Sequence, residues 1–174
     1  MRCLKVFLLC LIFPALAMAN DVYQQPEEFI SEVFAGKPPQ RRVLSLTDSV
    51  RHEIKEILGH DLGVMRLRYW GEDGRTAWIL EETGKERPIT TGIVVNKGKL
   101  ELLKVLIYRE SRGSEVRHPF FTDQFKGATL EKDDELDRPI DGISGATLST
   151  RALTRLVRLA LYLHQQSEQA NVAN

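Results

Sequence analysis

Apolar and polar residues alternate through the middle of the chain, from Val64 to Tyr108. This period of two is typical of strands with one buried face, and it falls into the segments 64–70, 76–82, 91–96 and 99–108. Gly71-Glu72-Asp73-Gly74 and Asn96-Lys97-Gly98 separate neighbouring segments in the manner of hairpin turns. The last segment is apolar on both faces, as central strands are. The pattern predicts an antiparallel sheet of about four strands.

On either side of this region, apolar residues recur every three or four positions, as on one face of a helix. Residues 26–34 form the first such segment. The second ends at Gly59 and has Thr47 or Asp48 as its cap. The third, residues 150–166, is the most regular in the chain. Together with the strands, these segments predict an α+β fold in which helices pack against the sheet.

The first residues resemble a secretory signal peptide. Arg2 and Lys5 precede an apolar run that ends at the small-x-small sequence Ala17-Met18-Ala19, so we expect cleavage after Ala19 and a periplasmic protein. Both cysteines, Cys3 and Cys10, fall within this leader. The chain has 24 basic and 24 acidic residues, so loss of the two leader cations leaves a small negative charge. On this ground no overall positive field indicates binding to nucleic acid or to anionic lipid.

These features divide the chain into parts. They are a signal peptide over 1–19, a helical N-terminal arm over 20–62, a main domain over 63–166 and a flexible tail over 167–174. Within the main domain, residues 109–141 are charged and are interrupted by glycine and proline. A loop of this length inside a compact domain is more often functional than not.

Small and hydroxyl residues, in the sequence DGISGATLST at 141–150, precede the last helical segment. Ser144 or Thr147 is placed to cap this helix, whose first amides have no partner within the helix. An anion there gains hydrogen bonds and a favourable interaction with the helix dipole, so the local chemistry suits a phosphate. Capping alone also explains such residues, and Asp141 could serve as an Asx turn. From these residues alone both interpretations stay open.

The sequence Asp141-Gly142-Ile143-Ser144-Gly145-Ala146-Thr147 resembles the flavinylation motif of the FMN-binding domain family, Asp-Gly-x-Ser/Thr-Gly-Ala-Thr. That domain occurs in the C subunit of the sodium-pumping NADH:quinone reductase and in the G subunit of the Rnf electron-transfer complex. There, a flavin transferase that uses FAD and Mg²⁺ esterifies FMN through its phosphate onto the threonine. The resemblance implies covalent FMN on Thr147, with Asp141 serving the transferase and its metal. It implies these cofactor-binding residues: Asp141, Gly142, Ser144, Gly145, Ala146, Thr147, Leu148 and Ser149.

The resemblance extends more weakly over residues 89–164. Residues 108–113 stand where the family has a glutamate loop, although the usual threonine and proline are missing, and residues 120–125 match an aromatic-Gln-Phe segment. A flavin ring offers a large flat apolar face, so we expect Tyr108, Phe120 or Phe121 to contact it. Packing in the protein core is the alternative for these aromatic residues.

A second Gly-Ala-Thr-Leu sequence, at 127–130, is not expected to accept a flavin. Lys126 replaces the hydroxyl residue of the motif there, and the acidic run that follows has no apolar helical face. Thr129 is therefore interpreted as an ordinary loop residue.

Two further groups of residues could bind a partner or a metal. Arg151, Arg155 and Arg158 lie at i, i+4 and i+7, and form either a solvated helix face or a docking stripe for an acidic partner. The four histidines lack the spacing of metal ligands; they are His52, His60, His118 and His164. No metal site or catalytic residue is predicted.

These observations predict an exported FMN carrier that relays electrons between a membrane redox protein and an extracytoplasmic acceptor. Such a protein is an electron-transfer flavoprotein rather than an enzyme that turns over alone, and it is at most peripheral to the membrane. No second nucleotide motif is present to support oxidation of NADH by the chain itself. The alternative is a periplasmic redox sensor or binding module, in which the flavin or an unmodified motif serves regulation or partner binding.

Overall fold

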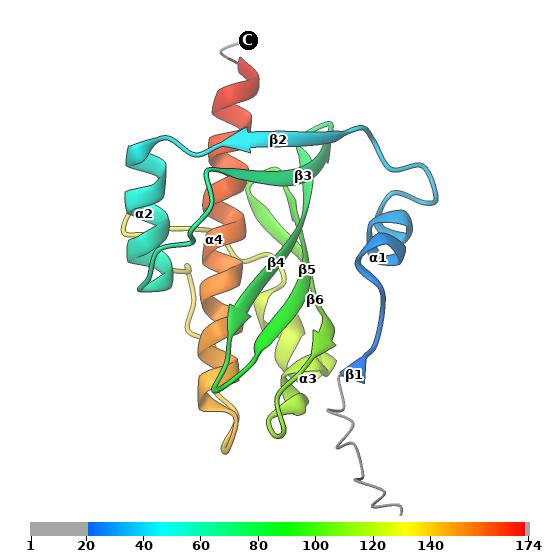
Figure 1. The fold of residues 1–174 in the computed structure, drawn as a ribbon, viewed down its shortest axis with the longest axis vertical. Coiled ribbons are helices and arrows are strands. Elements are labelled where there is room, and N and C mark those ends of the chain that lie inside the picture. The colour runs from blue at the N-terminus through cyan, green and yellow to red at the C-terminus, as the bar shows by residue number, and fades with distance from the viewer. Residues whose placement is uncertain (1–20, 173–174) are drawn as a thin grey trace, which may run out of the picture.

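The chain is built on one antiparallel sheet with helices on both of its faces (Figure 1). The computed structural model describes residues 21–172. Its strands are β1 (Asp21–Val22), β2 (Arg41–Ser45), β3 (Arg66–Glu72), β4 (Arg75–Thr83), β5 (Pro88–Asn96) and β6 (Lys99–Tyr108). Its helices are α1 (Pro26–Val33), α2 (Asp48–Leu58), η1 (Ser114–Arg117), α3 (Pro119–Thr122), η2 (Asp123–Phe125) and α4 (Thr147–Val172). The predicted α+β class is confirmed.

The sheet has six strands in the order β1-β6-β5-β4-β3-β2, not the four expected. Strands β3 to β6 are the four that the alternating pattern predicts, and they pair in sequence order. The two additional strands lie at the edges of the sheet, where β1 pairs with β6 and β2 pairs with β3. Both belong to the N-terminal arm, which is therefore only partly helical. Neither strand shows an alternation of apolar and polar residues, because β1 has only two residues and β2 has only one buried side chain.

The two faces of the sheet are covered by different helices. Helix α1 packs on one face, and α2 and α4 pack on the other (Figure 1). Phe29 of α1 lies so close to β5 that a methyl group added at Gly92 would come within 2.5 Å of its ring. Glycine at position 92 is what lets α1 approach the sheet this closely.

Helix α2 begins and ends where the sequence predicts. Thr47 accepts a hydrogen bond from the Val50 amide (3.3 Å), and Gly59 closes the helix in the left-handed conformation. Val50, Ile54, Ile57 and Leu58 are buried on one face of the helix. The caps and the apolar face together explain why this short segment is helical.

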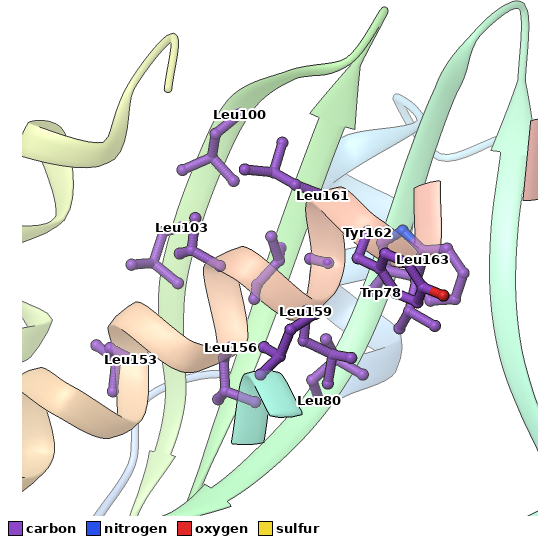
Figure 2. Close-up of a cluster of buried hydrophobic side chains, with 14 of the residues drawn as sticks. Trp78, Leu80, Leu100, Leu103, Leu153, Leu156, Leu159, Leu161, Tyr162 and Leu163 are labelled. Carbon is purple, nitrogen blue, oxygen red and sulfur yellow. The ribbon is translucent and has the colours of Figure 1, made fainter. Parts of the chain in front are cut away.

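Helix α4 crosses the sheet and supplies more of the main core than any other element (Figure 2). Its leucines lie next to residues of β4 and β6; the labelled members of the cluster are Trp78, Leu80, Leu100, Leu103, Leu153, Leu156, Leu159, Leu161, Tyr162 and Leu163. The helix continues to Val172, past the end expected at Gln166. Ser167 is buried and donates to the carbonyl oxygen of His164 (2.8 Å), so the helix stays packed as far as this residue.

The segment between β6 and α4 is irregular, as predicted, except for three short helices. Val116, Phe121 and Phe125 are buried in the main core and fix this segment to the sheet. The segment therefore has a defined path past the start of α4.

No helix among residues 21–172 has the length and apolar character needed to cross a membrane. The predicted signal peptide and its cleavage site lie outside the described residues.

Candidate functional site

The motif at residues 141–147 leads directly into α4, with Thr147 as the first helical residue. A turn precedes the helix, in which the Ala146 amide donates to the Ile143 carbonyl (3.0 Å) and Gly145 adopts a positive φ of 83°. The motif side chains divide by burial. Ala146, Ser149 and Thr150 are buried, whereas the exposed residues are Asp141, Gly142, Ser144, Gly145, Thr147 and Leu148. The Thr147 hydroxyl is therefore presented to solvent at the start of a long helix.

The first turn of α4 has no side-chain cap. Within residues 21–172, no hydrogen bond uses the amides of Thr147, Leu148 or Ser149, and the first amide bonded back along the helix is that of Thr150 (2.9 Å, to the Ala146 carbonyl). The expectation that Ser144 or Thr147 caps the helix is corrected. Ala146, which has no acceptor, occupies the capping position, and Thr147 is already helical. The free amides and the helix dipole together favour an anion beside Thr147.

Two clefts meet at Thr147. The first has a volume of about 510 Å³; its lining is Lys85, Glu110, Ser111, Arg112, Gly145, Ala146, Thr147, Leu148 and Ser149. The second has a volume of about 380 Å³; its lining is Ile140, Gly142, Thr147, Thr150, Arg151, Thr154, Arg155 and Arg158. We call these the loop cleft and the arginine cleft. Both volumes fall within the usual range for small-ligand sites.

Glu110 organises the wall of the loop cleft. Its Oε1 accepts hydrogen bonds from the backbone amides of Lys85, Glu86 (2.8 Å) and Arg87 (3.1 Å), which form the turn between β4 and β5. Three donors on one carboxylate oxygen hold this turn beside the start of α4. The glutamate loop of the resemblance therefore has a definite structural role in this chain, although it lacks the usual threonine and proline.

A buried hydroxyl pair joins the motif to the same loop. Tyr108 donates its phenolic proton to the Arg112 carbonyl, so the Ser149 hydroxyl donates to Tyr108 Oη (3.0 Å). Burial, the largest effect, raises the pKa of Tyr108. Ser149 is thus occupied inside the protein and supplies its amide, rather than its hydroxyl, to the site.

The aromatic residues expected at a flavin ring are mostly core residues. Tyr108 and Phe121 are fully buried, and Phe121 meets Phe125 edge to face, with ring centroids 5.4 Å apart. This part of the expectation is wrong, because both side chains are needed to anchor the loop to the sheet. Phe120 is 63% exposed and lies beside His118, so of these three residues it alone presents a free ring.

Gln124 was not identified from the sequence, although it is the glutamine of the aromatic-Gln-Phe segment. Its side chain accepts from the Asp141 amide (2.8 Å) and donates to the Asp141 carbonyl (3.4 Å). The Asp141 carboxylate forms no Asx turn and, among the described residues, no hydrogen bond, which corrects the simple structural role considered for it. Gln124 thus fixes the backbone at the start of the motif and leaves the carboxylate exposed.

The second Gly-Ala-Thr sequence lies in a different setting. The Gly127 amide donates to the Leu100 carbonyl, and the Thr129 amide donates to Asp137 Oδ1 (3.3 Å). No helix follows; Leu130 instead forms an isolated bridge with Leu136. Thr129 is a loop residue, as predicted.

The three arginines of α4 do not form a free cationic stripe. Arg155 lies 3.7 Å from the buried carboxylate of Glu82, and Arg158 pairs with Glu135 (3.0 Å). Arg151 has no such partner within the described residues and is exposed at the arginine cleft. Two of the three positive charges on which the docking interpretation depends are therefore paired with carboxylates of the same chain.

The histidines with described contacts have structural partners. His60 bonds the Asp61 carbonyl and the Glu82 carboxylate (2.9 Å), which raise its pKa in that order. Nδ1 of His164 bonds the Thr76 hydroxyl (2.9 Å), and its Nε2 accepts from the Gly98 amide (3.2 Å). Among residues 21–172, no cluster of three potential metal-ligating side chains is present.

The site therefore combines an exposed threonine hydroxyl, unpaired helix amides and an adjoining cleft that contains Lys85 and Arg112. This donor set suits a phosphate that carries a larger group. Residues 84–162 match the model of a family described as the FMN-binding domain, and no similar chain is found among the curated proteins or the solved structures. The match begins at the turn held by Glu110 and includes both clefts and the whole motif. It supports the assignment of residues 84–162 to the FMN-binding domain family, with FMN as the cofactor.

Proposed function

We propose that the chain is an exported electron carrier in which FMN is bound through its phosphate to the hydroxyl of Thr147, in the manner of the reductase C subunit and the Rnf G subunit. The observation that carries this proposal is the exposed Thr147 side chain beside three unpaired amides at the start of α4. Its neighbours Ala146 and Ser149 are buried, so the backbone of Thr147 is held in place against the core.

Attachment requires a flavin transferase that supplies the FMN group from FAD with Mg²⁺. The Thr147 oxygen forms a new bond to the phosphorus of the FMN half of FAD. The bond from that phosphorus to the oxygen that bridges it to the AMP half breaks, and AMP leaves. The hydroxyl proton goes to a base of the transferase. The exposed Asp141 carboxylate stands in the same motif, free to meet the transferase and its metal.

The residues of the chain then hold the product. The amides of Thr147, Leu148 and Ser149 would hold the phosphate, and Lys85 and Arg112, which line the same cleft, would offset its charge. FMN supplies one- or two-electron transfer, while the protein contributes attachment, orientation and charge. A covalent bond prevents loss of the cofactor by dilution in an exported protein.

The carrier would exchange electrons between a membrane redox protein and an extracytoplasmic acceptor. The two clefts that meet at Thr147 are open to solvent, which supports access of a partner to a group bound there. The exposed ring of Phe120 is a third feature that a bound flavin or a partner could contact.

The proposal is tested by coexpression with an active flavin transferase and measurement of intact masses. The wild type should gain one FMN adduct, and Thr147→Ala should lose it completely. Thr129→Ala, in the second Gly-Ala-Thr sequence and outside the motif, should keep it. Circular dichroism should show that Thr147→Ala stays folded, because this hydroxyl makes no hydrogen bond within the described residues. An adduct on Thr147→Ala, or no adduct on the wild type, would contradict the proposal.

A further inference from the structure

A group of unpaired positive charges lies at the end of the molecule opposite to the start of α4 (Figure 1). Strands β2 and β3 pair so that Val43 is opposite Arg68, Ser45 is opposite Arg66 and Arg41 is opposite Trp70. Directly opposite residues project to the same side of a sheet. Arg41, Val43, Arg66 and Arg68 therefore share one face, which we call the cationic face.

The arginines of this face have no counter-charge. All three are exposed, and within residues 21–172 none of their side chains takes part in an ion pair or hydrogen bond. The segments 37–47 and 62–71 contain no acidic residue. In a chain with equal numbers of acidic and basic residues, this local excess of positive charge is distinctive. It indicates a surface that attracts anions.

Exposed apolar side chains accompany the charges. Val43 is 55% exposed between the arginines, and Val64 and Met65, just before β3, are 42% and 58% exposed. Cations mixed with exposed aliphatic side chains are typical of surfaces that lie on membranes, where the apolar groups enter the headgroup layer. Protein interfaces also bury exposed aliphatic side chains, so the choice between a bilayer and an acidic protein depends on where the face lies.

The position of the cationic face argues against two other occupants. Arg42 of β2 donates to Asn171 near the end of α4 (3.4 Å), and at about 1.5 Å per residue Asn171 is about 36 Å from Thr147. A redox partner bound here would be far from a flavin at Thr147. A second copy pairing along the edge of β2 would use the backbone of β2 and leave Arg66 and Arg68 of β3 without a counter-charge.

We propose that the cationic face binds the surface of a bilayer that contains anionic phospholipids. The electrostatic attraction comes from Arg41, Arg66 and Arg68, and Val43 enters the interface between them. The start of α4 lies at the other end of the molecule from β2 (Figure 1), so lipid bound at the cationic face would leave Thr147 uncovered. The proposal rests on the proposed function only in that the Thr147 site would stay free for redox partners.

The test is cosedimentation of the full chain with vesicles of phosphatidylglycerol and phosphatidylcholine, compared with vesicles of phosphatidylcholine alone. The full chain is used in every arm, so its first 20 residues contribute equally throughout. Binding should be stronger to the anionic vesicles and should weaken as salt is raised. Each lost cation should weaken it about fivefold, so Arg66→Glu/Arg68→Glu should weaken it about 25-fold or more.

A matched variant controls for net charge. Lys126→Glu/Lys132→Glu makes the same change in charge at exposed positions away from β2 and β3, and it should bind like the wild type. Val43→Ser should weaken binding a few-fold without changing the charge. Equal binding to both kinds of vesicle, no binding to anionic vesicles, or equal loss in the control variant would overturn the proposal. Thr147→Ala should bind vesicles normally, so failure here and failure of the flavin assignment are distinguishable.

Discussion

Removal of the Glu110 carboxylate should loosen the loop cleft without disturbing the core. In Glu110→Ala, the amides of Lys85, Glu86 and Arg87 lose their common acceptor. Hydrogen bonds to a charged group contribute about 1.5 to 3 kcal/mol each in protected positions. These amides are near solvent, and water replaces part of the loss, so we expect a total cost of about 2 kcal/mol rather than the full sum.

For a chain of 174 residues, this cost corresponds to a decrease in melting temperature of about 4 to 8 °C. Glu110→Gln keeps an oxygen acceptor without the charge and should lose about half as much. Glu115→Ala is the matched control, because Glu115 is exposed nearby and its side chain makes no hydrogen bond within the described residues. Thermal unfolding followed by circular dichroism gives the three values.

Hydrogen exchange of the 85–87 amides provides a second, local measurement. Exchange there should accelerate in Glu110→Ala, while amides in the middle of β5 should change little, because β5 is paired with β4 on one side and β6 on the other. A melting temperature within about 1 °C of the Glu115→Ala control, with unchanged exchange at 85–87, would refute the role assigned to Glu110.

Three further results are expected. Gln124→Leu, which removes both bonds to the Asp141 backbone, should slow FMN attachment about tenfold in a time course of intact mass, and unchanged kinetics would show that the bonds do not matter. Gly92→Ala should destabilise the fold by about 1 to 3 kcal/mol in urea unfolding, with partial recovery when Phe29 is shortened to leucine. Burial lowers the pKa of His164 below 6.5, so the unfolded chain binds the proton first and stability should decrease as pH falls below about 6.5. The decrease should be smaller in His164→Gln, and equal pH dependence would contradict this account.

The sequence predicts those elements whose signals are local. The alternating residues of β3 to β6, the cap and glycine stop of α2 and the apolar face of α4 all depend on neighbours within a few positions. Strand β2 could not be predicted in this way, because its five residues adopt the strand conformation only by pairing with β3. Its two arginines give no alternating pattern, and the partner strand lies about 20 residues further along the chain.

The candidate site also has a part that the sequence predicts and a part that it does not. Thr147 and the free amides beside it were predicted, since the motif and the helix start are contiguous in the sequence. The partners of Glu110 and Gln124 are backbone amides of distant segments, which no side-chain pattern marks. The burial of Tyr108 depends on a contact with Ser149, 41 residues away. Such contacts are set by the tertiary fold, and sequence periodicity carries no information about them.

The uncapped start of α4 has a thermodynamic consequence. The three free amides come together only when the helix is formed, so an anion bound to them is linked to folding and stabilises the folded chain. A phosphate esterified to Thr147 would be present at a fixed, high local concentration that dilution cannot lower. The cofactor would then complete the helix that carries it, and the chain would be more stable after modification than before.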